Sequence, residues 1–564
     1  ASYDEDNNNR LSEAELRVKG NVRSAMGGFI RGHARELDRN DDGVLTRTEV
    51  VDNAVRMFTK IDANEDDKIS PTELEFTRRT DNDSKAPARN PKRERTALHD
   101  SKASSPDLAT ATLPTNQATQ PNFIFILVDD MGWKDTGFAG NGFVETPNTD
   151  RIAREGIVFS QAYSSAPNCA PSRACIMSGQ YPPRHGIYTV VDERHAPGSV
   201  HHKILAAHSE DTMDTDVITI AECFQRADYA TAAFGMWNLG RGRSGPTTAT
   251  GQGFDLYRKP QDLGFDRQSY FDRDGRFITD VFTDLGIRFM EENKERPFFL
   301  YLPYHAIHAP FKPKAELLAK YQRKARAIGD RDADPVYASM VESVDQNVGR
   351  IMDALERLDL YDNTMVIFTS DNGGLPQFVA PLNGSKGALY EGGIRVPACV
   401  WWSGINDAGR TCNTPILGMD WYPTMLDAAG IQRPQQRLDG ASVLTVLQNT
   451  GKVNRDAVFW HFPSYVGRGA PSSAIRMGDW KLIEQYEDRS IELYNLATDI
   501  SESRNLAQSE SAKANELYAR LMSWQKATEA AIPSESNPNY DPSAKHNRRQ
   551  SKQKGSAENR RNRS

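Results

Sequence analysis

The stretch Asn122-Phe-Ile-Phe-Ile-Leu-Val128 is followed directly by Asp129 and Asp130. Its apolar residues run without alternation, which is typical of a strand buried on both faces of a sheet. Two further runs of this kind, residues 298–302 and 365–369, are separated by amphipathic helical patterns. The pattern predicts an α/β fold, in which helices flank a large and mostly parallel sheet.

Acidic and amide side chains follow two of these predicted strands. Asp129 and Asp130 come after the first run, and Asp371 and Asn372 follow the run at 365–369. The carboxyl ends of parallel strands meet at one edge of a sheet, so these side chains are expected to lie together. Four oxygen donors suit Ca²⁺ or Mg²⁺ better than zinc. The alternative is that they form turns or helix caps.

The segment Asn168-Cys-Ala-Pro-Ser-Arg173 is a second candidate for chemistry. Pro171 is suited to the first position of a helix, which predicts that Cys169 lies just ahead of the helix N-terminus. Free N–H groups there favour an anion and a reactive side chain. Arg173 would lie one turn into the helix and carry a fixed positive charge. The alternative for Cys169 is a buried, inert cysteine.

This segment, with Ser178-Gly179 downstream, resembles the C-x-P-S-R signature of the sulfatase family. Further segments match that family's motifs in the same order: Thr146-Pro-Asn-Thr-Asp150, His305-Ala-Ile-His308-Ala-Pro310, Thr369-Ser-Asp371-Asn372-Gly373, Gly384-Ser-Lys386-Gly387, Glu391-Gly-Gly-Ile-Arg395-Val-Pro397, Gly478-Asp-Trp480-Lys481-Leu482 and Glu492-Leu-Tyr494-Asn-Leu496. The resemblance covers about residues 121–510. It implies the alkaline-phosphatase-like fold of sulfatases.

The resemblance also implies a metal and a modified residue. The ligands that it implies for calcium are the four oxygen donors at the strand ends, namely Asp129, Asp130, Asp371 and Asn372. A formylglycine-generating enzyme would oxidise Cys169 to formylglycine, and a hydroxyl of the hydrated aldehyde would attack sulfur. Arg173 and Lys386 would clamp the sulfate oxygens. His308, supported by His305, would contact the ester oxygen as sulfate binder or proton donor.

One segment departs from the family pattern. Where sulfatases usually read G-K-W-H-L-G, this chain has Gly235-Met236-Trp237-Asn238-Leu239-Gly240. Met236 carries no charge and Asn238, at the substrate-binding position, cannot shuttle a proton, so two contacts to the sulfate are expected to be lost. His201-His202-Lys203 is a candidate replacement, although it also fits a plain polar loop.

Three twelve-residue segments near the start repeat the ligand spacing of an EF-hand calcium loop. The predicted ligands are Asp4, Asp6, Asn8, Arg10 and Glu15 in the first loop, Asp38, Asn40, Asp42, Val44, Thr46 and Glu49 in the second, and Asp62, Asn64, Asp66, Lys68, Ser70 and Glu73 in the third. The second and third loops are close enough for one helix to connect them, as in dockerin-like modules that bind partner proteins. The alternative is a solvated acidic segment.

Composition divides the chain into five parts. The EF-hand module takes residues 1–79, and residues 80–120 have the polar composition of a flexible linker. The catalytic domain is predicted over 121–455, and shorter segments over 456–532 predict a small antiparallel subdomain. Residues 533–564 carry many Lys and Arg without apolar periodicity, which predicts a disordered basic tail.

Charge and hydropathy limit the classes of protein. The net charge of −7 over 564 residues argues against a nucleic-acid binder. No apolar run approaches the roughly 20 residues that span a bilayer. The chain starts at Ala1, which is compatible with a removed signal peptide or with a trimmed start. With the calcium loops, this predicts a secreted or periplasmic protein. The five cysteines predict no particular disulfide.

The sequence therefore predicts a calcium-dependent sulfatase that hydrolyses sulfate monoesters, with sulfated carbohydrate as the expected substrate. A protein partner of the EF-hand module is a further expectation. Two alternatives stay open. One is a phosphonate or phosphodiester hydrolase on the same scaffold. The other is a protein that only binds sulfated ligands, inactivated by Met236 and Asn238. Four retained residues argue against it, namely Cys169, Arg173, His308 and Lys386.

Overall fold

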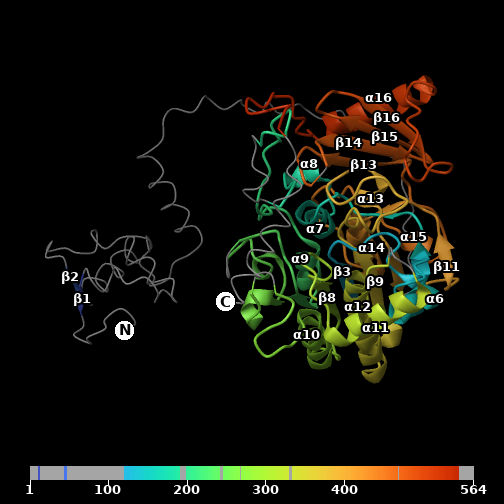
Figure 1. The fold of residues 1–564 in the computed structure, drawn as a ribbon. Coiled ribbons are helices and arrows are strands. Elements are labelled where there is room, and N and C mark those ends of the chain that lie inside the picture. The colour runs from blue at the N-terminus through green and yellow to red at the C-terminus, as the bar shows by residue number, and fades with distance from the viewer. Residues whose placement is uncertain are drawn as a thin grey trace, which may run out of the picture. The chain divides into compact units, whose positions relative to one another are not determined.

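The computed structural model describes residues 120–190, 199–241, 245–266, 269–329, 333–467 and 469–544, together with two short strands near the N-terminus (Figure 1). The chain forms two compact units, Ala1–Leu113 and Pro114–Ser564. The second unit contains both the predicted catalytic domain and the predicted C-terminal subdomain. Within the described residues, no helix is both long enough and apolar enough to cross a lipid bilayer.

The described part of the N-terminal unit is a pair of strands. β1 (Arg10–Ser12) runs antiparallel to β2 (Val44–Thr46), and Leu11 lies opposite Leu45. Both leucines hold the eighth position of a predicted EF-hand loop. Of the residues predicted to bind calcium in this unit, Arg10, Val44 and Thr46 belong to these strands. The others lie outside the described residues.

An eight-stranded sheet in the order β11-β4-β10-β9-β3-β8-β6-β7 forms the centre of the second unit. Its strands are β3 (Asn122–Val128), β4 (Ile157–Phe159), β6 (Ala230–Phe234), β7 (Leu256–Arg258), β8 (Phe298–Pro303), β9 (Thr364–Ser370), β10 (Ala398–Trp401) and β11 (Arg410–Cys412). β3 lies parallel to β8 and β9, which confirms the predicted parallel centre. The sheet becomes mixed at one side, because β10 runs antiparallel to β9 and β4.

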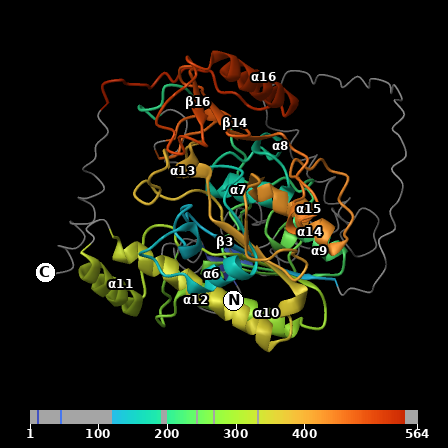
Figure 2. The same cartoon turned by 90° about the vertical axis from the view of Figure 1, so that its right-hand side faces the viewer.

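Helices cover both faces of this sheet (Figure 2). Every residue of β3 is buried, and its alternate side chains enter two different cores. One face carries α6 (Pro147–Glu155), α10 (Ile278–Glu292) and α12 (Pro335–Arg357), with α11 (Ala315–Ile328) packed on α12. The other carries α7 (Cys169–Ser178), α9 (Ile220–Arg226) and α14 (Trp421–Ala429). Burial on both faces explains why the strand sequences do not alternate.

The C-terminal subdomain is an antiparallel sheet covered by one helix, as predicted. Its elements are β13 (Ala457–Phe462), β14 (Ser472–Met477), β15 (Trp480–Gln485), β16 (Ile491–Asn495) and α16 (Ser511–Ala527). On β15, the ammonium of Lys481 lies 2.9 Å from Glu391 and 2.8 Å from Glu502, and all three side chains are fully buried. This ion-pair network joins β15 of the subdomain to Glu391 of the main domain.

The remaining regular elements are short. They include the parallel pair β5 (Ala162–Tyr163) and β12 (Ile416–Leu417), the helices α8 (Pro182–His185), α13 (Glu391–Ile394) and α15 (Leu444–Leu447), and several 3-10 helices of three or four residues.

The predicted basic tail begins later than its composition indicates. Residues 533–544 are described and bonded to the main domain. The Asn537 amide donates to the carbonyls of Ser199 (2.8 Å) and His202 (2.7 Å), and Ser536 forms a β-bridge with Ile204. These residues are held by backbone and amide hydrogen bonds rather than by apolar side chains. Such contacts produce no apolar periodicity, so the sequence does not reveal them. Residues 545–564 lie outside the described part of the chain.

Candidate active site

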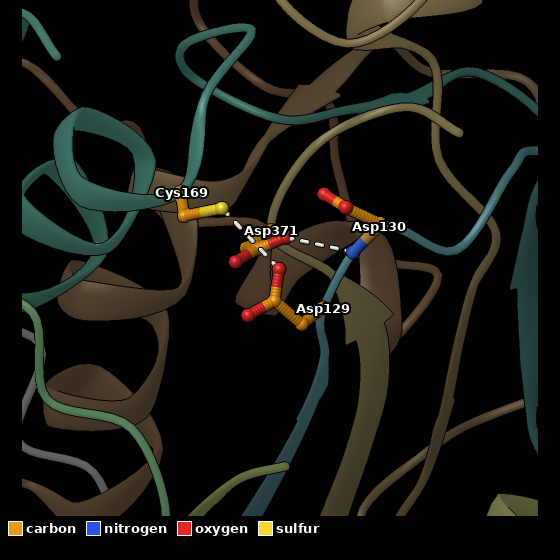
Figure 3. A group of neighbouring side chains, drawn as sticks. All are labelled: Asp129, Asp130, Cys169 and Asp371. Carbon is orange, nitrogen blue, oxygen red and sulfur yellow. Dashed lines mark hydrogen bonds between the residues drawn. The ribbon is translucent and has the colours of Figure 1, made fainter. Parts of the chain in front are cut away.

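Four side chains from distant parts of the chain meet at the carboxyl edge of the sheet (Figure 3). Asp129 and Asp130 follow β3, Asp371 follows β9, and Cys169 is the first residue of α7. One ligand atom from each of these residues lies within 4.8 Å of the others, and all four side chains are buried. The edge predicted from the strand order therefore carries the predicted cluster.

Backbone geometry directs these side chains towards one another. Asp130 has a φ of 67°, a left-handed conformation that aspartate tolerates better than most residues. Its backbone N–H donates to Oδ1 of Asp371 (3.3 Å), and the Asn372 amide donates to Oδ1 of Asp130 (2.8 Å). The two strand ends are thus bonded directly across the site.

The cluster suits a hard cation. Burial and the negative charge of Asp129 raise the pKa of Asp371 to about 7, although Arg173 opposes that shift. A divalent cation would relieve this repulsion between buried carboxylates. The buried Oδ1 of Asn372 has no hydrogen-bond partner among the described residues, so it is a free oxygen donor. Carboxylate and amide oxygens are the ligands that Ca²⁺ prefers, and the residues fit that ion.

Cys169 lies at one side of the cluster in Figure 3, with its Sγ directed to the carboxylates. The helix begins two residues earlier than predicted, because the side chain of Asn168 accepts the backbone N–H of Cys169 and caps α7. The thiol donates to Oδ1 of Asp129 (3.2 Å) and accepts from the ammonium of Lys386 (3.1 Å). Burial, together with the charges of Asp129 and Asp371, raises the pKa of Cys169 well above its ordinary value. An unmodified Cys169 is therefore a thiol at neutral pH, a poor nucleophile.

Lys386 brings a positive charge into the cluster. Its ammonium lies 2.6 Å from Oδ1 of Asp130 as well as beside Cys169, and 14% of its side chain is exposed. Partial exposure leaves this side chain able to reach an anion at the mouth of the site.

Arg173 lies beside the predicted metal ligands. It is fully buried, and its guanidinium contacts Asp371 (2.7 Å), Asp129 (3.0 Å) and the carbonyl oxygen of Met236 (2.6 Å). Through these contacts Arg173 links the carboxylates of Asp129 and Asp371 to each other. The residue predicted to clamp sulfate is bonded to the predicted metal ligands, an arrangement that spacing along the chain could not reveal.

The two histidines of the motif at 305–308 face each other. Their ring centroids lie 5.4 Å apart at 24°. Nδ1 of His308 lies 2.6 Å from the carbonyl oxygen of Ala309, so Nε2 is directed to the site, 3.8 Å from Asp130. Burial lowers the pKa of His305 to about 4, so His305 is neutral at pH 7. His308, 37% exposed, is the histidine that a substrate can reach.

The anomalous segment lies against the same cluster. The backbone N–H of Met236 donates to the carbonyl of Pro303 (2.9 Å) while its own carbonyl accepts from Arg173. Asn238 is half-buried with a φ of 59°, which asparagine tolerates well. The candidate replacements contact the C-terminal subdomain: the ring of His202 stacks on Tyr465 (3.7 Å), and Lys203 pairs with Glu487 (3.6 Å).

Sequence reasoning missed Asn168, whose cap fixes the start of α7. An asparagine directly before a helix is a common N-cap signal, and that rule would have placed the helix start at Cys169. The prediction placed the helix start at Pro171, two residues too late, because it took proline as the first helical residue. Proline is tolerated anywhere in the first turn.

Comparison with known proteins identifies this arrangement. The family model "Sulfatase" matches residues 121–431, and the model "N-sulphoglucosamine sulphohydrolase, C-terminal" matches residues 385–527. A protein named "Sulfatase" from Formosa agariphila is 32% identical over 483 residues, which cover 71% of this chain and 87% of that protein. N-acetylgalactosamine-6-sulfatase from Canis lupus familiaris is 31% identical, over 66% of this chain and 74% of that protein.

Solved structures agree with these matches. The crystal structure of Ps i-CgsB is 29% identical with a TM-score of 0.63, covering 74% of this chain and 95% of that one. Phosphonate monoester hydrolase of Agrobacterium radiobacter, 20% identical with a TM-score of 0.56, covers 72% of this chain and 96% of that one and shares the fold. The family model spans more than half of the chain, and Cys169 and Asp371 of the matched motifs form a buried cluster with Asp129 and Asp130. The chain therefore belongs to the sulfatase family of sulfuric ester hydrolases.

Proposed function

We propose that this protein is a calcium-dependent sulfatase that uses a formylglycine made from Cys169. The observation that carries the proposal is the position of Cys169: its Sγ lies 3.2 Å from Asp129 and 3.1 Å from Lys386, inside a buried cluster of carboxylates. In the structure this sulfur stands in for the oxygens of a hydrated aldehyde. An aldehyde hydrate at this position would have both a metal-ligand group and a cationic group within reach.

The surrounding residues would divide the chemistry between them. Asp129, Asp130, Asp371 and Asn372 would hold the calcium ion, which when bound makes a neighbouring hydroxyl more acidic. Arg173 keeps two of those carboxylates in place from beneath. The ammonium of Lys386 would bind the sulfate oxygens and stabilise the charge that develops on them. Nε2 of His308 would give a proton to the leaving alcohol.

Sulfated carbohydrate is the proposed class of substrate. Two named relatives support this choice: N-acetylgalactosamine-6-sulfatase at 31% identity and Ps i-CgsB, whose structure has also been solved in complex with k-i-k-neocarrahexaose, at 29% identity. We also propose an extracytoplasmic location, secreted or periplasmic. Sulfated carbohydrates and weak calcium sites both belong to that setting.

Mass analysis of the peptide that contains Cys169 tests the mechanism. In protein made by a host with a formylglycine-generating enzyme, we expect the loss of mass that accompanies conversion of a thiol to an aldehyde. Protein from a host without that enzyme is the control and should keep the thiol. A peptide that remains entirely cysteine in the native host would exclude the proposed nucleophile.

The double substitution Met236→Lys and Asn238→His tests whether the anomalous segment weakens the site. If it does, kcat/KM on an aryl sulfate should rise by about tenfold or more, because each restored charged contact is worth about a few kcal/mol of transition-state stabilisation. Histidine is compatible with the φ of 59° at position 238. The two single variants should be non-additive, since both would contact one anion.

Other outcomes of this experiment are also informative. If the double variant gains nothing while removal of His202 or Lys203 lowers activity, those residues have taken over the missing roles. If all variants are inactive on every sulfate ester, despite formylglycine and bound calcium, the protein only binds its sulfated ligand.

We further propose that residues 1–79 form an EF-hand module that binds calcium and a partner protein. The pairing of Leu11 with Leu45 supports this, because equivalent positions of two predicted loops are opposite each other. Deleting residues 1–113, the first compact unit, should remove weak calcium sites and leave hydrolysis of a small sulfate ester within about twofold. Calorimetric calcium titration and steady-state kinetics measure both effects. Loss of activity on the small ester would contradict a separate module.

A further inference from the structure

Tyr270 lies behind the two histidines of the proposed site. It is fully buried, and its hydroxyl lies 3.0 Å from the carbonyl oxygen of His305 and 2.5 Å from that of His308. Its ring stacks on the ring of His305, with centroids 5.2 Å apart at 22°. One side chain thus contacts both ends of the turn that presents the histidines.

Tyr270 is itself held firmly. Its carbonyl accepts the backbone N–H of Ile278 at the start of α10 (2.9 Å), and its ring stacks on Phe277 at 5.6 Å. A β-bridge between Phe271 and Phe277 closes the same hairpin. These contacts hold the backbone and ring of Tyr270 in place, so the position of its hydroxyl is also restricted.

The turn at 305–308 has few other supports in its backbone. His308 N–H donates to the carbonyl of His305 (3.0 Å), and the residues between them exchange two bonds with the backbone of Asp129 (2.9 and 3.0 Å). The carbonyls of His305 and His308 both point to the Tyr270 hydroxyl. A single hydroxyl that contacts both carbonyls restricts their separation, and with it the backbone from which the His308 side chain projects.

We infer that Tyr270 is a positioning residue that orients His308 for proton transfer to the leaving oxygen of the ester. This rests on the proposed function and deepens it. A hydroxyl oxygen of the hydrated formylglycine forms a bond to sulfur as the S–O bond to the leaving group breaks. The electron pair of the broken bond stays on the leaving oxygen, which takes the proton from Nε2 of His308 and departs as an alcohol. Tyr270 does not touch the substrate. It acts by holding Nε2 in line with the leaving oxygen.

Two substrates that differ in their leaving group test this role. An alkyl sulfate has a poor leaving group and needs the proton, whereas 4-nitrophenyl sulfate releases a stable phenolate and hardly needs it. Tyr270→Phe keeps the ring but removes the hydroxyl. It should lower kcat on the alkyl sulfate by about tenfold or more, part of the 10²–10⁴-fold that a general acid supplies, and lower kcat on the aryl sulfate by less than about twofold.

Tyr304→Phe is the matched control. Tyr304 is also fully buried and lies in the adjoining segment, but its hydroxyl bonds to Thr283 (2.7 Å), away from the turn. Both substrates should respond equally, within about twofold, to this variant. A cycle with His308→Ala supplies a second measurement: the penalty of Tyr270→Phe on the alkyl sulfate should vanish in that background.

The results separate this inference from the proposed function. Wild-type hydrolysis of both esters, with formylglycine present, establishes the function alone. Equal losses on the two substrates in Tyr270→Phe, no loss at all, or a penalty that persists without His308 would each overturn the positioning role. A preferential loss on the alkyl sulfate that disappears in the His308→Ala background would establish it.

Discussion

Asp371→Asn should lower kcat/KM on a small sulfate ester by about 10³-fold or more, since removing one preorganised electrostatic group commonly costs 10²–10³-fold and this residue acts on several. Asn keeps the shape of the side chain but removes its negative charge. Arg173 loses the nearer of its two carboxylate partners, at 2.7 Å, and the proposed calcium site loses one carboxylate. The expected second result is a large drop in bound calcium, measured by atomic emission on the purified protein.

The control for this substitution is Asp345→Asn. Asp345 is another buried carboxylate, and it accepts the backbone N–H groups of Asn148 and Thr149 at the start of α6. Asp345→Asn should lower the melting temperature and leave calcium content and kcat nearly unchanged. An Asp371→Asn protein that keeps both its calcium and its activity would contradict the assignment of this cluster as the metal site.

Arg173→Lys is expected to lower both calcium affinity and kcat by about 10²-fold, because Lys cannot make the forked contacts that join two carboxylates and a carbonyl. Arg173 is wholly buried, and its contacts are with Asp129, Asp371 and Met236. A buried ion pair that loses one partner costs about 3–5 kcal/mol of folding free energy. The variant is therefore also expected to be less stable. Calcium titration, kinetics and thermal melting measure the three effects.

The same variant separates two roles for Arg173. If Arg173 holds the metal ligands, raising the calcium concentration should restore part of the lost activity. If it clamps the sulfate, as the sequence predicts, KM should rise while calcium affinity stays the same. Lys386→Met is the reference for sulfate binding, because Lys386 is partly exposed and contacts Cys169 directly. An Arg173→Lys variant that behaves like Lys386→Met would favour the clamp.

The sequence predicts the frame of this protein well because its signals are local. Unbroken apolar runs identify β3, β8 and β9 almost to the residue. A strand buried on both faces excludes polar side chains at nearly every position, so its bounds are visible in the sequence. The acidic residues that follow β3 and β9 are then placed together by topology alone.

Other features depend on contacts that spacing does not encode. Whether Arg173 points towards solvent or towards two carboxylates is decided by the packing of α7 against the strand ends. Tyr270 comes from a hairpin with no recognisable motif, and it reaches the histidines only in the folded chain. The antiparallel course of β10 likewise follows from the connection between distant segments rather than from its own residues.

The buried Lys481–Glu391–Glu502 network bears on how the enzyme can be divided. Glu391 lies just after the loop that carries Lys386, and its carboxylate also accepts the hydroxyl of Tyr163 (2.8 Å). Cutting the chain near residue 455 would remove Lys481 and Glu502 and leave Arg395, 3.2 Å away, as the charged partner of that glutamate. Breaking a buried network of this kind costs several kcal/mol. The two sheets should consequently melt in one cooperative transition, and the smallest fragment that retains catalysis must include both.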